Sequence, residues 1–204
     1  MKQHCVIISG GRFSELTGIG AADFVIACDR GVEYAARGGV RPDLLVGDFD
    51  SYHGVLPEGV PVLDLPVEKD DTDTMAAIRW AVGEGYRAFT ICCALGGRLD
   101  HLLGNLQAAV FAVEHGARVH ITDSENELYL FSKGSLVLPP RSGWSLSVLA
   151  MTDVCGDVSI RGAKYPLSHV RVTNSFPIGI SNEWQGDVEI TAGEGVLLVV
   201  SSKM

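Results

Sequence analysis

The chain has 204 residues, of which 47% are hydrophobic and 20% charged, so it can bury the core of one domain or of two small ones. Its 16 Lys and Arg against 25 Asp and Glu give a formal net charge of -9. This balance argues against a nucleic-acid-binding surface, which needs clustered cations. No apolar run approaches the roughly 18 residues that a membrane-spanning helix needs, so we expect no membrane partner.

The cysteines indicate a reduced protein without structural zinc, because their number, five, is odd and none forms a CxxC pair. Cys28, Cys92 and Cys93 lie in apolar, strand-like runs, where a free cysteine behaves as a small hydrophobic residue. The N-terminal stretch "MKQHCVIISGG" has too short an apolar run for a signal peptide. We therefore expect a cytoplasmic protein.

Residues 1–127 alternate short apolar runs with helical patterns. The runs that predict buried strands are "CVIIS" (5–9), "FVIAC" (24–28), "DLLVG" (43–47), "VPVLDLPV" (60–67), "AFTICCAL" (88–95) and "RVHIT" (118–122). Apolar residues at helical spacing predict helices within 31–39, 72–85 and 100–116. Such alternation predicts an α/β domain with a mostly parallel, doubly wound sheet, which binds ligands beyond the carboxyl ends of its strands.

From residue 128 onward the pattern changes to short strands without a convincing helix. The strand candidates, separated by Gly, Pro, Asn and Asp, are 128–132, 134–140, 144–151, 157–162, 169–175, 186–192 and 195–202. This pattern predicts an antiparallel β-sandwich or a barrel-like lobe. We therefore expect two domains, 1–127 and 128–204.

Two carboxylates follow the predicted strand 43–47, in "GDFDS". In an extended segment alternate residues face the same way, so Asp48 and Asp50 can project together while Phe49 points elsewhere. Mg²⁺ prefers oxygen ligands of this kind and often bridges to phosphates. The alternative is a loop in which one Asp caps a turn.

Four more carboxylates crowd into "EKDDTD", directly before the second predicted helix. Asp71 or Thr72 can serve as the N-cap, and Asp73 lies in the first turn, where the helix dipole favours negative charge. Capping explains one or two of these acids, but it does not explain the others or Lys69 beside them. A cation site is the second interpretation, with Glu68 and Asp71 as solvated or capping members.

The third group is "GGRLDH", where a strand runs into Gly96, Gly97 and Arg98. Glycines before a helix N-terminus let backbone amides approach a phosphate, and Arg98 can add a forked contact. Gly-Gly before a helix is also ordinary turn chemistry, and His101 alone is more often structural than catalytic. A parallel sheet places all the acids that follow its strands or begin its helices on one edge: Asp29, Asp48, Asp50, Asp73 and Asp100.

Taken in order, "GDFDS", "KDDTD", "GGRLDH" and the late "YPL" and "GISNEW" strongly resemble the thiamine pyrophosphokinase family, over roughly residues 25–185. The resemblance implies an α/β catalytic domain, a C-terminal β-sandwich, and a homodimer with thiamine bound between its subunits. It implies the small-molecule substrates ATP and thiamine, with Mg²⁺ as cofactor. The diphosphate of ATP would move to the thiamine hydroxyl, releasing AMP.

Site residues carried over from this resemblance fall into four groups. Asp29, Asp48, Asp50 and Asp73 would form the metal set, and Asp73 and Asp100 would be catalytic, orienting or deprotonating the hydroxyl. ATP would contact Asp29, Arg30, Ser51, Lys69, Asp70, Thr72, Arg98 and His101, although Arg30 departs from the family's usual Gly. Tyr165 would stack on thiamine, with Ser181 and Asn182 as polar contacts. The alternatives are a sheet-core role for Tyr165 and an ordinary turn for Ser181 and Asn182.

Two other functions remain open from the residues alone. A metal-dependent glycosyltransferase also uses Asp-x-Asp to hold a nucleotide diphosphate, but that interpretation leaves "KDDTD" and the C-terminal lobe unexplained. A non-catalytic sensor of nucleotide or thiamine would not need all the acids present here.

Overall fold

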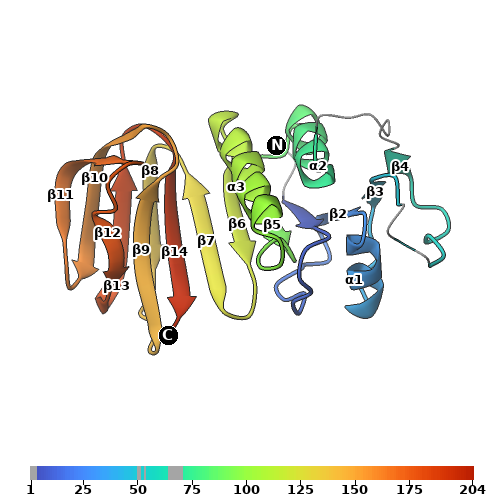
Figure 1. The fold of residues 1–204 in the computed structure, drawn as a ribbon, viewed down its shortest axis with the longest axis horizontal. Coiled ribbons are helices and arrows are strands. Elements are labelled where there is room, and N and C mark those ends of the chain that lie inside the picture. Colours follow the sequence, from blue (N-terminus) through green and yellow to red (C-terminus); the bar gives the residue numbers. More distant parts are fainter. Residues whose placement is uncertain (1–3, 50–51, 53, 64–70) are drawn as a thin grey trace. The chain divides into compact units, whose positions relative to one another are not determined.

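The computed structural model describes residues 4–49, 52, 54–63 and 71–204, and these residues fall into two compact units, 1–124 and 125–204 (Figure 1). Among the described residues, no helix is long and apolar enough to cross a membrane.

Unit 1 is a parallel sheet with helices. Its strands are β1 (Cys5–Ile8), β2 (Phe24–Cys28), β3 (Leu44–Val46), β4 (Val62–Leu63), β5 (Ala88–Cys92) and β6 (Arg118–Thr122). Their order within the unit is β6-β5-β1-β2-β3-β4, and in the described part of the unit neighbouring strands are parallel. The helices are α1 (Gly31–Arg37), α2 (Asp73–Gly83) and α3 (Leu99–Glu114). The predicted doubly wound α/β fold is confirmed.

The winding of the sheet reverses beside its central strand. The chain moves outward from β1 to β4, then returns to the other side of β1 to form β5 and β6. Right-handed crossovers in opposite directions put their helices on opposite faces. Val32 and Ala35 of α1 pack against Val6 and Ile8 on one face, whereas α2 packs against α3 and also contacts β1 and β2. The topological switch point therefore lies between β1 and β5.

Burial on both faces explains why the strand sequences are continuously apolar. All four residues of β1 are fully buried, which requires apolar side chains at successive rather than alternate positions. Within unit 1, the largest difference from the predicted strands that can be compared in full is in β5, which ends at Cys92 rather than at residue 95, because Cys93 takes a left-handed conformation with φ 56°. Of the predicted strand 60–67, Val62–Leu63 is a strand and residues 64–67 lie outside the described part of the chain.

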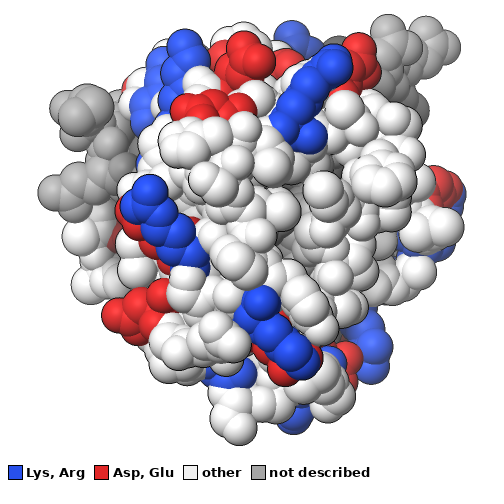
Figure 2. All heavy atoms as spheres, turned by 90° about the vertical axis from the view of Figure 1, so that its left-hand side faces the viewer, with Lys and Arg blue, Asp and Glu red and all other residues white. Residues whose placement is uncertain are grey.

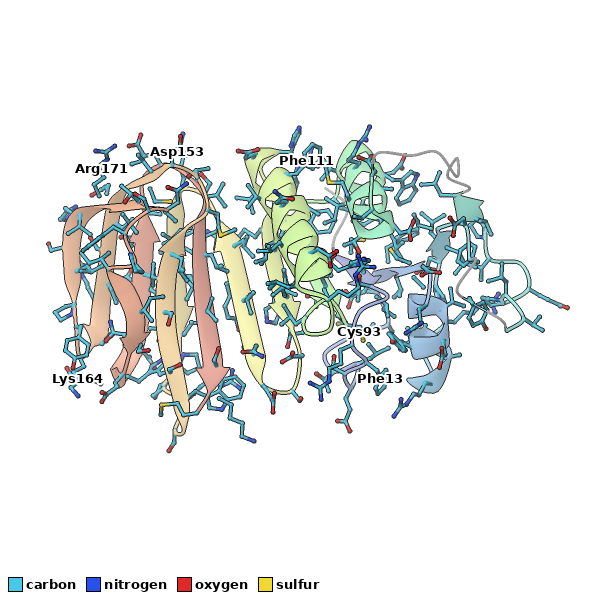
Figure 3. The ribbon with its side chains drawn as sticks, viewed as in Figure 1. Phe13, Cys93, Phe111, Asp153, Lys164 and Arg171 are labelled. Carbon is cyan, nitrogen blue, oxygen red and sulfur yellow. The ribbon has the colours of Figure 1, made fainter. Side chains whose placement is uncertain are left out.

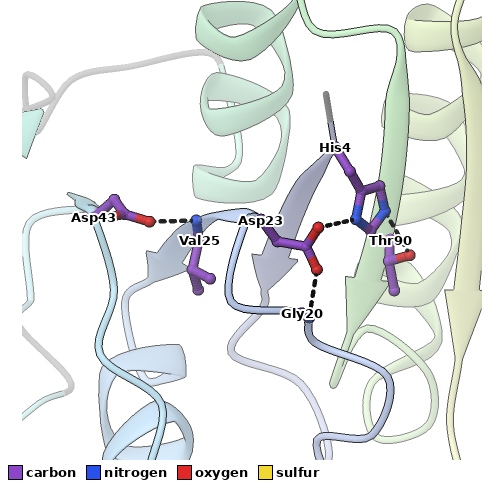
Figure 4. A network of polar contacts seen from close by, with 6 residues as sticks. All are labelled: His4, Gly20, Asp23, Val25, Asp43 and Thr90. Atoms are coloured by element: carbon purple, nitrogen blue, oxygen red, sulfur yellow. Dashed lines mark hydrogen bonds and ion pairs between the residues drawn. The ribbon is translucent and has the colours of Figure 1, made fainter. Parts of the chain in front are cut away.

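A polar network fastens the amino edge of the sheet (Figure 4). Asp23, just before β2, accepts a hydrogen bond from Gly20 N at 2.6 Å and lies 3.0 Å from His4 Nδ1. Burial opposes ionisation of Asp23, but these two partners outweigh burial and lower its pKa. Asp43, just before β3, accepts from Val25 N at 2.8 Å. Asp23 and Asp43 therefore hold the loops at this edge together.

Unit 2 consists of two antiparallel sheets. One has the order β12 (Gly179–Asn182), β9 (Trp144–Ala150), β14 (Leu197–Lys203), β7 (Asn126–Phe131). The other has the order β11 (Leu167–Thr173), β10 (Val154–Ala163), β13 (Trp184–Ala192), β8 (Gly134–Leu138). A shared core takes Leu146 and Val199 from the first sheet and Ile160 and Ile190 from the second. The predicted β-sandwich is confirmed. β12 is an additional strand, which contains Ser181 and Asn182, the residues for which an ordinary turn was the alternative.

Candidate active site

Loops from several strands meet at the carboxyl edge of the unit 1 sheet, around the end of β1. Ser9 continues from β1, and its hydroxyl hydrogen-bonds the Thr74 hydroxyl of α2 at 2.7 Å, with both residues buried. The Cys28 thiol at the end of β2 donates to the Asp73 carbonyl at 3.7 Å. These contacts hold the first turn of α2 against the ends of β1 and β2, so Asp73 lies at the edge where ligands bind in such sheets.

The residues at the acidic start of α2 have different roles. Thr72 is the N-cap, and its hydroxyl accepts from Met75 N at 3.2 Å, which confirms one of the two predicted caps. Asp71 instead forms an ion pair with Arg79. Asp73 opens the helix as its first residue. Lys69 and Asp70, both predicted ATP contacts, lie outside the described residues, as does Glu68.

Asp29 lies where the loops after β1, β2 and β3 come together. It has a left-handed backbone with φ 45°, and its N–H donates to the Val46 carbonyl at 3.0 Å. A Cβ at Gly47 would lie 3.3 Å from Asp29 N, and one at Gly10 would lie 3.7 Å from Asp29 Oδ2. Gly47 therefore allows the loop after β3 to approach this acid closely, whereas the distance at Gly10 is an ordinary van der Waals contact. Arg30, the following residue, is exposed.

The geometry assumed for "GDFDS" is wrong. Phe49 has φ 56°, so the chain turns after β3 instead of continuing in the extended form that aligns alternate side chains. The Phe49 ring is half-buried against the cluster on the α1 face of the sheet, and this packing favours the turn. Asp48 is exposed at this turn. Asp50 and Ser51 lie outside the described residues, so their relation to Asp48 stays a prediction.

The loop after β5 is shaped by two successive glycines. Gly96 and Gly97 have φ of 74° and 73°, a left-handed conformation that glycine adopts without strain. Asn105 of α3 fixes the loop by donating from Nδ2 to the Ala94 carbonyl at 2.8 Å. Arg98 donates to Asp100 with Nε at 3.1 Å and Nη2 at 2.5 Å. This forked contact lowers the pKa of the Asp100 carboxyl. His101 is exposed in the first turn of α3, and its backbone N–H donates to Asp100 Oδ1 at 2.9 Å.

The chemistry of this edge suits a hard cation, because its acids are carboxylates. Asp29, Asp48 and Asp73 all come from loops or helix starts at the carboxyl edge. Within the described residues, no group of three or more His, Cys, Asp or Glu side chains is close enough to hold a metal ion. The predicted metal set also includes Asp50, which lies outside that part of the chain.

The predicted thiamine residues of unit 2 lie together. Asn182, 4% exposed, accepts from Tyr165 N at 2.9 Å and Glu183 N at 3.0 Å, and its Nδ2 donates to Tyr165 O at 2.8 Å. The Tyr165 side chain is 57% exposed, so the alternative of a sheet-core residue is wrong. Ser181 is exposed on β12 beside them, with φ 59°. Asn182 therefore fixes the backbone of Tyr165.

Lys164 and Glu183 form an ion pair beside the Tyr165 ring that the sequence did not indicate. Lys164 Nζ lies 2.8 Å from Glu183 Oε1 and 5.4 Å from the centre of the ring (Figure 3 labels Lys164). The hydrogen bond with Glu183 raises the pKa of Lys164. The carboxylate balances the ammonium charge, which would otherwise oppose a second cation on the same ring.

Sequence reasoning also missed the loop that follows β1. Ser9, Gly10, Gly11 and Arg12 lie at the centre of the carboxyl edge, because β1 is central in the sheet. The sequence does contain a pattern that could have indicated this loop, because Gly-Gly-Arg occurs at residues 10–12 as well as at 96–98.

Comparisons with known proteins agree with both units. The family model "Thiamin pyrophosphokinase, catalytic domain" matches residues 18–121, and "Thiamin pyrophosphokinase, vitamin B1 binding domain" matches residues 136–197. The thiamine pyrophosphokinase of Bacillus subtilis (strain 168) is 27% identical over 184 residues, 87% of this chain and 86% of that protein.

Solved structures extend the similarity to the whole chain. A thiamin pyrophosphokinase structure from Geobacillus thermodenitrificans is 28% identical, with a TM-score of 0.82 and 98% of each chain covered. One from Bacillus subtilis, at 24% identity, shares the fold with a TM-score of 0.87 and 100% of each chain covered. Because the catalytic-domain model alone spans half of the residues and the binding-domain model matches the other unit, this chain belongs to the thiamine pyrophosphokinase family and is an enzyme of that type.

Proposed function

We propose that this chain transfers the diphosphate of ATP to the hydroxyl of thiamine, giving thiamine diphosphate and AMP. ATP-dependent diphosphate transfer is the reaction of the family. The observation that carries the proposal is the convergence of the β1, β2, β3 and β5 loops with the start of α2 at one edge of the unit 1 sheet. Five of the predicted nucleotide contacts belong to these loops or to the helix starts that follow them: Asp29, Arg30, Thr72, Arg98 and His101. The other three, Ser51, Lys69 and Asp70, lie outside the described residues.

The metal ion in this proposal is Mg²⁺, held by Asp29, Asp48, Asp50 and Asp73. Carboxylate oxygens are the ligands that Mg²⁺ prefers among protein side chains. Bound Mg²⁺ would neutralise charge on the phosphates during transfer.

Asp73 and Asp100 are the two candidates for orienting the thiamine hydroxyl and accepting its proton. A strong general base needs a pKa close to the working pH, and the ion pair with Arg98 moves the pKa of Asp100 away from it. In the transfer, the hydroxyl oxygen forms a bond to the β-phosphorus. The bond from that phosphorus to the oxygen shared with the α-phosphate breaks, and AMP leaves. In this proposal Asp100 positions Arg98 toward the nucleotide.

Thiamine would stack its cationic ring on the exposed face of Tyr165, with Ser181 as a polar neighbour. Cation–π attraction of this kind is worth about 0.5–2 kcal/mol. The Lys164–Glu183 ion pair supports this role because it leaves the surroundings of the ring without net positive charge.

The reduced cytoplasm is the compartment we propose. All five cysteines are free and buried. Burial raises the pKa of Cys5 and Cys92 to about 12, so their thiols stay protonated and unreactive.

The product assay is the direct test. Incubation with ATP, thiamine and Mg²⁺ is expected to give AMP and thiamine diphosphate in equal amounts, and chelation of divalent cations with EDTA is expected to stop the reaction. Liquid chromatography separates AMP from ADP, and release of ADP instead would contradict diphosphate transfer. Hydrolysis of a sugar nucleotide would favour the glycosyltransferase, and binding of both substrates without product would favour the sensor.

We further propose a homodimer that uses the apolar side chains near the thiamine residues. Phe176, Ile178 and Ile180 are 66%, 45% and 48% exposed, and they flank or belong to β12. Figure 2 shows charged side chains of both signs around uncharged surface on one face of the molecule. Contiguous exposed apolar side chains favour association with another protein surface, and a second copy would place thiamine at the interface, as in the family.

Light scattering tests this assembly, with a mass of twice 21.8 kDa as the expected result. Ile180→Asp is expected to shift the protein toward monomer and to weaken thiamine binding, because a carboxylate would be buried at the interface. Val137→Asp is the control, since Val137 is similarly exposed, at 57%, but lies on β8 in the other sheet. A monomeric wild-type protein would refute the dimer.

A further inference from the structure

The tripeptide Gly-Gly-Arg occurs twice, and each copy follows a strand at the topological switch point. Residues 10–12 come one residue after β1, and residues 96–98 come shortly after β5. The two strands are parallel neighbours, with Ile8 paired to Cys92, so both loops leave the same edge. Ligands of doubly wound sheets bind beyond the strand ends at this point.

Direct contacts hold the two loops together. Ser9 N and Gly11 N donate to the carbonyls of Cys92 and Cys93, each at 2.9 Å, which continues the strand pairing past the strand ends. A Cβ at Gly96 would lie 3.2 Å from Arg12 Cδ, so the Arg12 stem packs on this glycine. Figure 3 places Phe13 and Cys93 on the same side of unit 1.

The β1 loop is also anchored to α1. The Tyr34 hydroxyl donates to the Gly11 carbonyl at 2.8 Å, while a Cβ at Gly11 would lie 2.6 Å from the Cys93 carbonyl oxygen. Gly11 is therefore fixed on both sides, and only glycine fits there without movement. The position of the Arg12 backbone follows from these anchors.

The two arginines differ in what they contact. Arg98 directs Nε and Nη2 to the carboxylate of Asp100. Arg12 is exposed, and its side chain makes no hydrogen bond or ion pair with any residue between 4 and 204 that the structure describes. The sequence contains 25 carboxylate side chains against 16 Lys and Arg. A guanidinium without a partner among the described residues, beside the ligand edge of so acidic a chain, is available for an anion outside the protein.

We propose that Arg12 binds phosphate oxygens of ATP at the switch point between β1 and β5, beside the Gly96 loop that carries Arg98. A guanidinium matches phosphate with two parallel hydrogen bonds and keeps its charge at any working pH. This assignment rests on the proposed use of ATP at the same edge and adds a residue that the family resemblance did not indicate.

Arg12→Ala tests the assignment by calorimetric titration with Mg²⁺ and ATP. Loss of a charged hydrogen-bond donor is expected to raise the dissociation constant for ATP about 10- to 100-fold. The dissociation constant for inorganic triphosphate should rise in parallel, while those for adenosine and thiamine should not change. Arg12→Lys keeps the positive charge but loses the pair of parallel hydrogen bonds, so its dissociation constant for ATP is expected to lie between those of the wild type and Arg12→Ala.

Arg171→Ala is the matched control, because it removes one exposed positive charge from β11 in unit 2 and is expected to bind ATP as wild type does. Circular dichroism checks the fold of each variant. Wild-type ATP affinity in both folded Arg12 variants would overturn the assignment, even where the product assay succeeds. Failure of the wild-type product assay would instead count against the proposed reaction, and the triphosphate titration would still decide whether Arg12 binds phosphate.

Discussion

Asp73→Asn is expected to reduce formation of thiamine diphosphate on the order of 10²- to 10³-fold while the protein stays folded. The substitution keeps the shape of the side chain but removes the negative charge, and with it the metal ligand and proton acceptor that we propose for this position. Losing one preorganised electrostatic contact of an active site typically has an effect of this size. The helix should survive, because its N-cap hydrogen bond comes from Thr72. Steady-state release of AMP measures the loss, and thermal unfolding checks the fold.

Asp71→Asn is the matched control, with the same chemical change two residues away. Asp71 forms an ion pair with Arg79 on α2, and both side chains are partly exposed. We expect turnover near that of the wild type and a loss of at most about 1 kcal/mol in the free energy of unfolding. Turnover of folded Asp73→Asn within a few-fold of wild type would remove Asp73 from the mechanism. Equal losses in both variants would show that the crowding of charge, and not one carboxylate, matters.

The parallel sheet was predictable because burial on both faces leaves a simple signature. β1, β2 and β6 have the predicted runs almost residue for residue, since each needs apolar side chains at successive positions. Once the sheet is parallel, acids that follow its strands share an edge, and for this reason Asp29 and Asp73 could be placed together before the fold was known. The Thr72 cap followed from local chemistry in the same way.

Features that depend on distant contacts were not predictable. Phe49 turns the chain after β3 because its ring packs on residues remote in sequence, so the local alternation rule failed there. β12 is short, begins with Gly179 and exists through pairing with β9. The β1 loop lies beside the loop that carries Arg98 because β1 pairs with β5, a strand more than 80 residues further along the chain.

The role of Asn182 also depends on contacts that the sequence does not reveal. The sequence suggests a polar contact to thiamine, whereas in the structure the side-chain amide forms hydrogen bonds with the backbone of Tyr165 and Glu183. Asn182 is only 4% exposed, so shortening its side chain would leave buried backbone groups without hydrogen-bond partners. Asn182→Ala is therefore expected to lower the free energy of unfolding by about 2–4 kcal/mol. It is also expected to raise the KM for thiamine, because the Tyr165 ring loses its fixed position, and to leave ATP binding unchanged.

A double-mutant cycle separates positioning from direct contact. Tyr165→Ala should weaken thiamine binding about 2- to 30-fold through loss of the cation–π contact, with little effect on stability because the ring is exposed. If Asn182 acts only through Tyr165, adding Asn182→Ala to Tyr165→Ala should weaken thiamine binding little further, although the unfolding midpoint in urea still falls. Asn174→Ala is the control: Asn174 is exposed and bonds the Asp153 side chain at 3.3 Å, so neither quantity should change appreciably. Additive losses of thiamine affinity would mean that Asn182 affects thiamine binding by a route other than Tyr165, because two residues that act through one contact cannot each remove it independently.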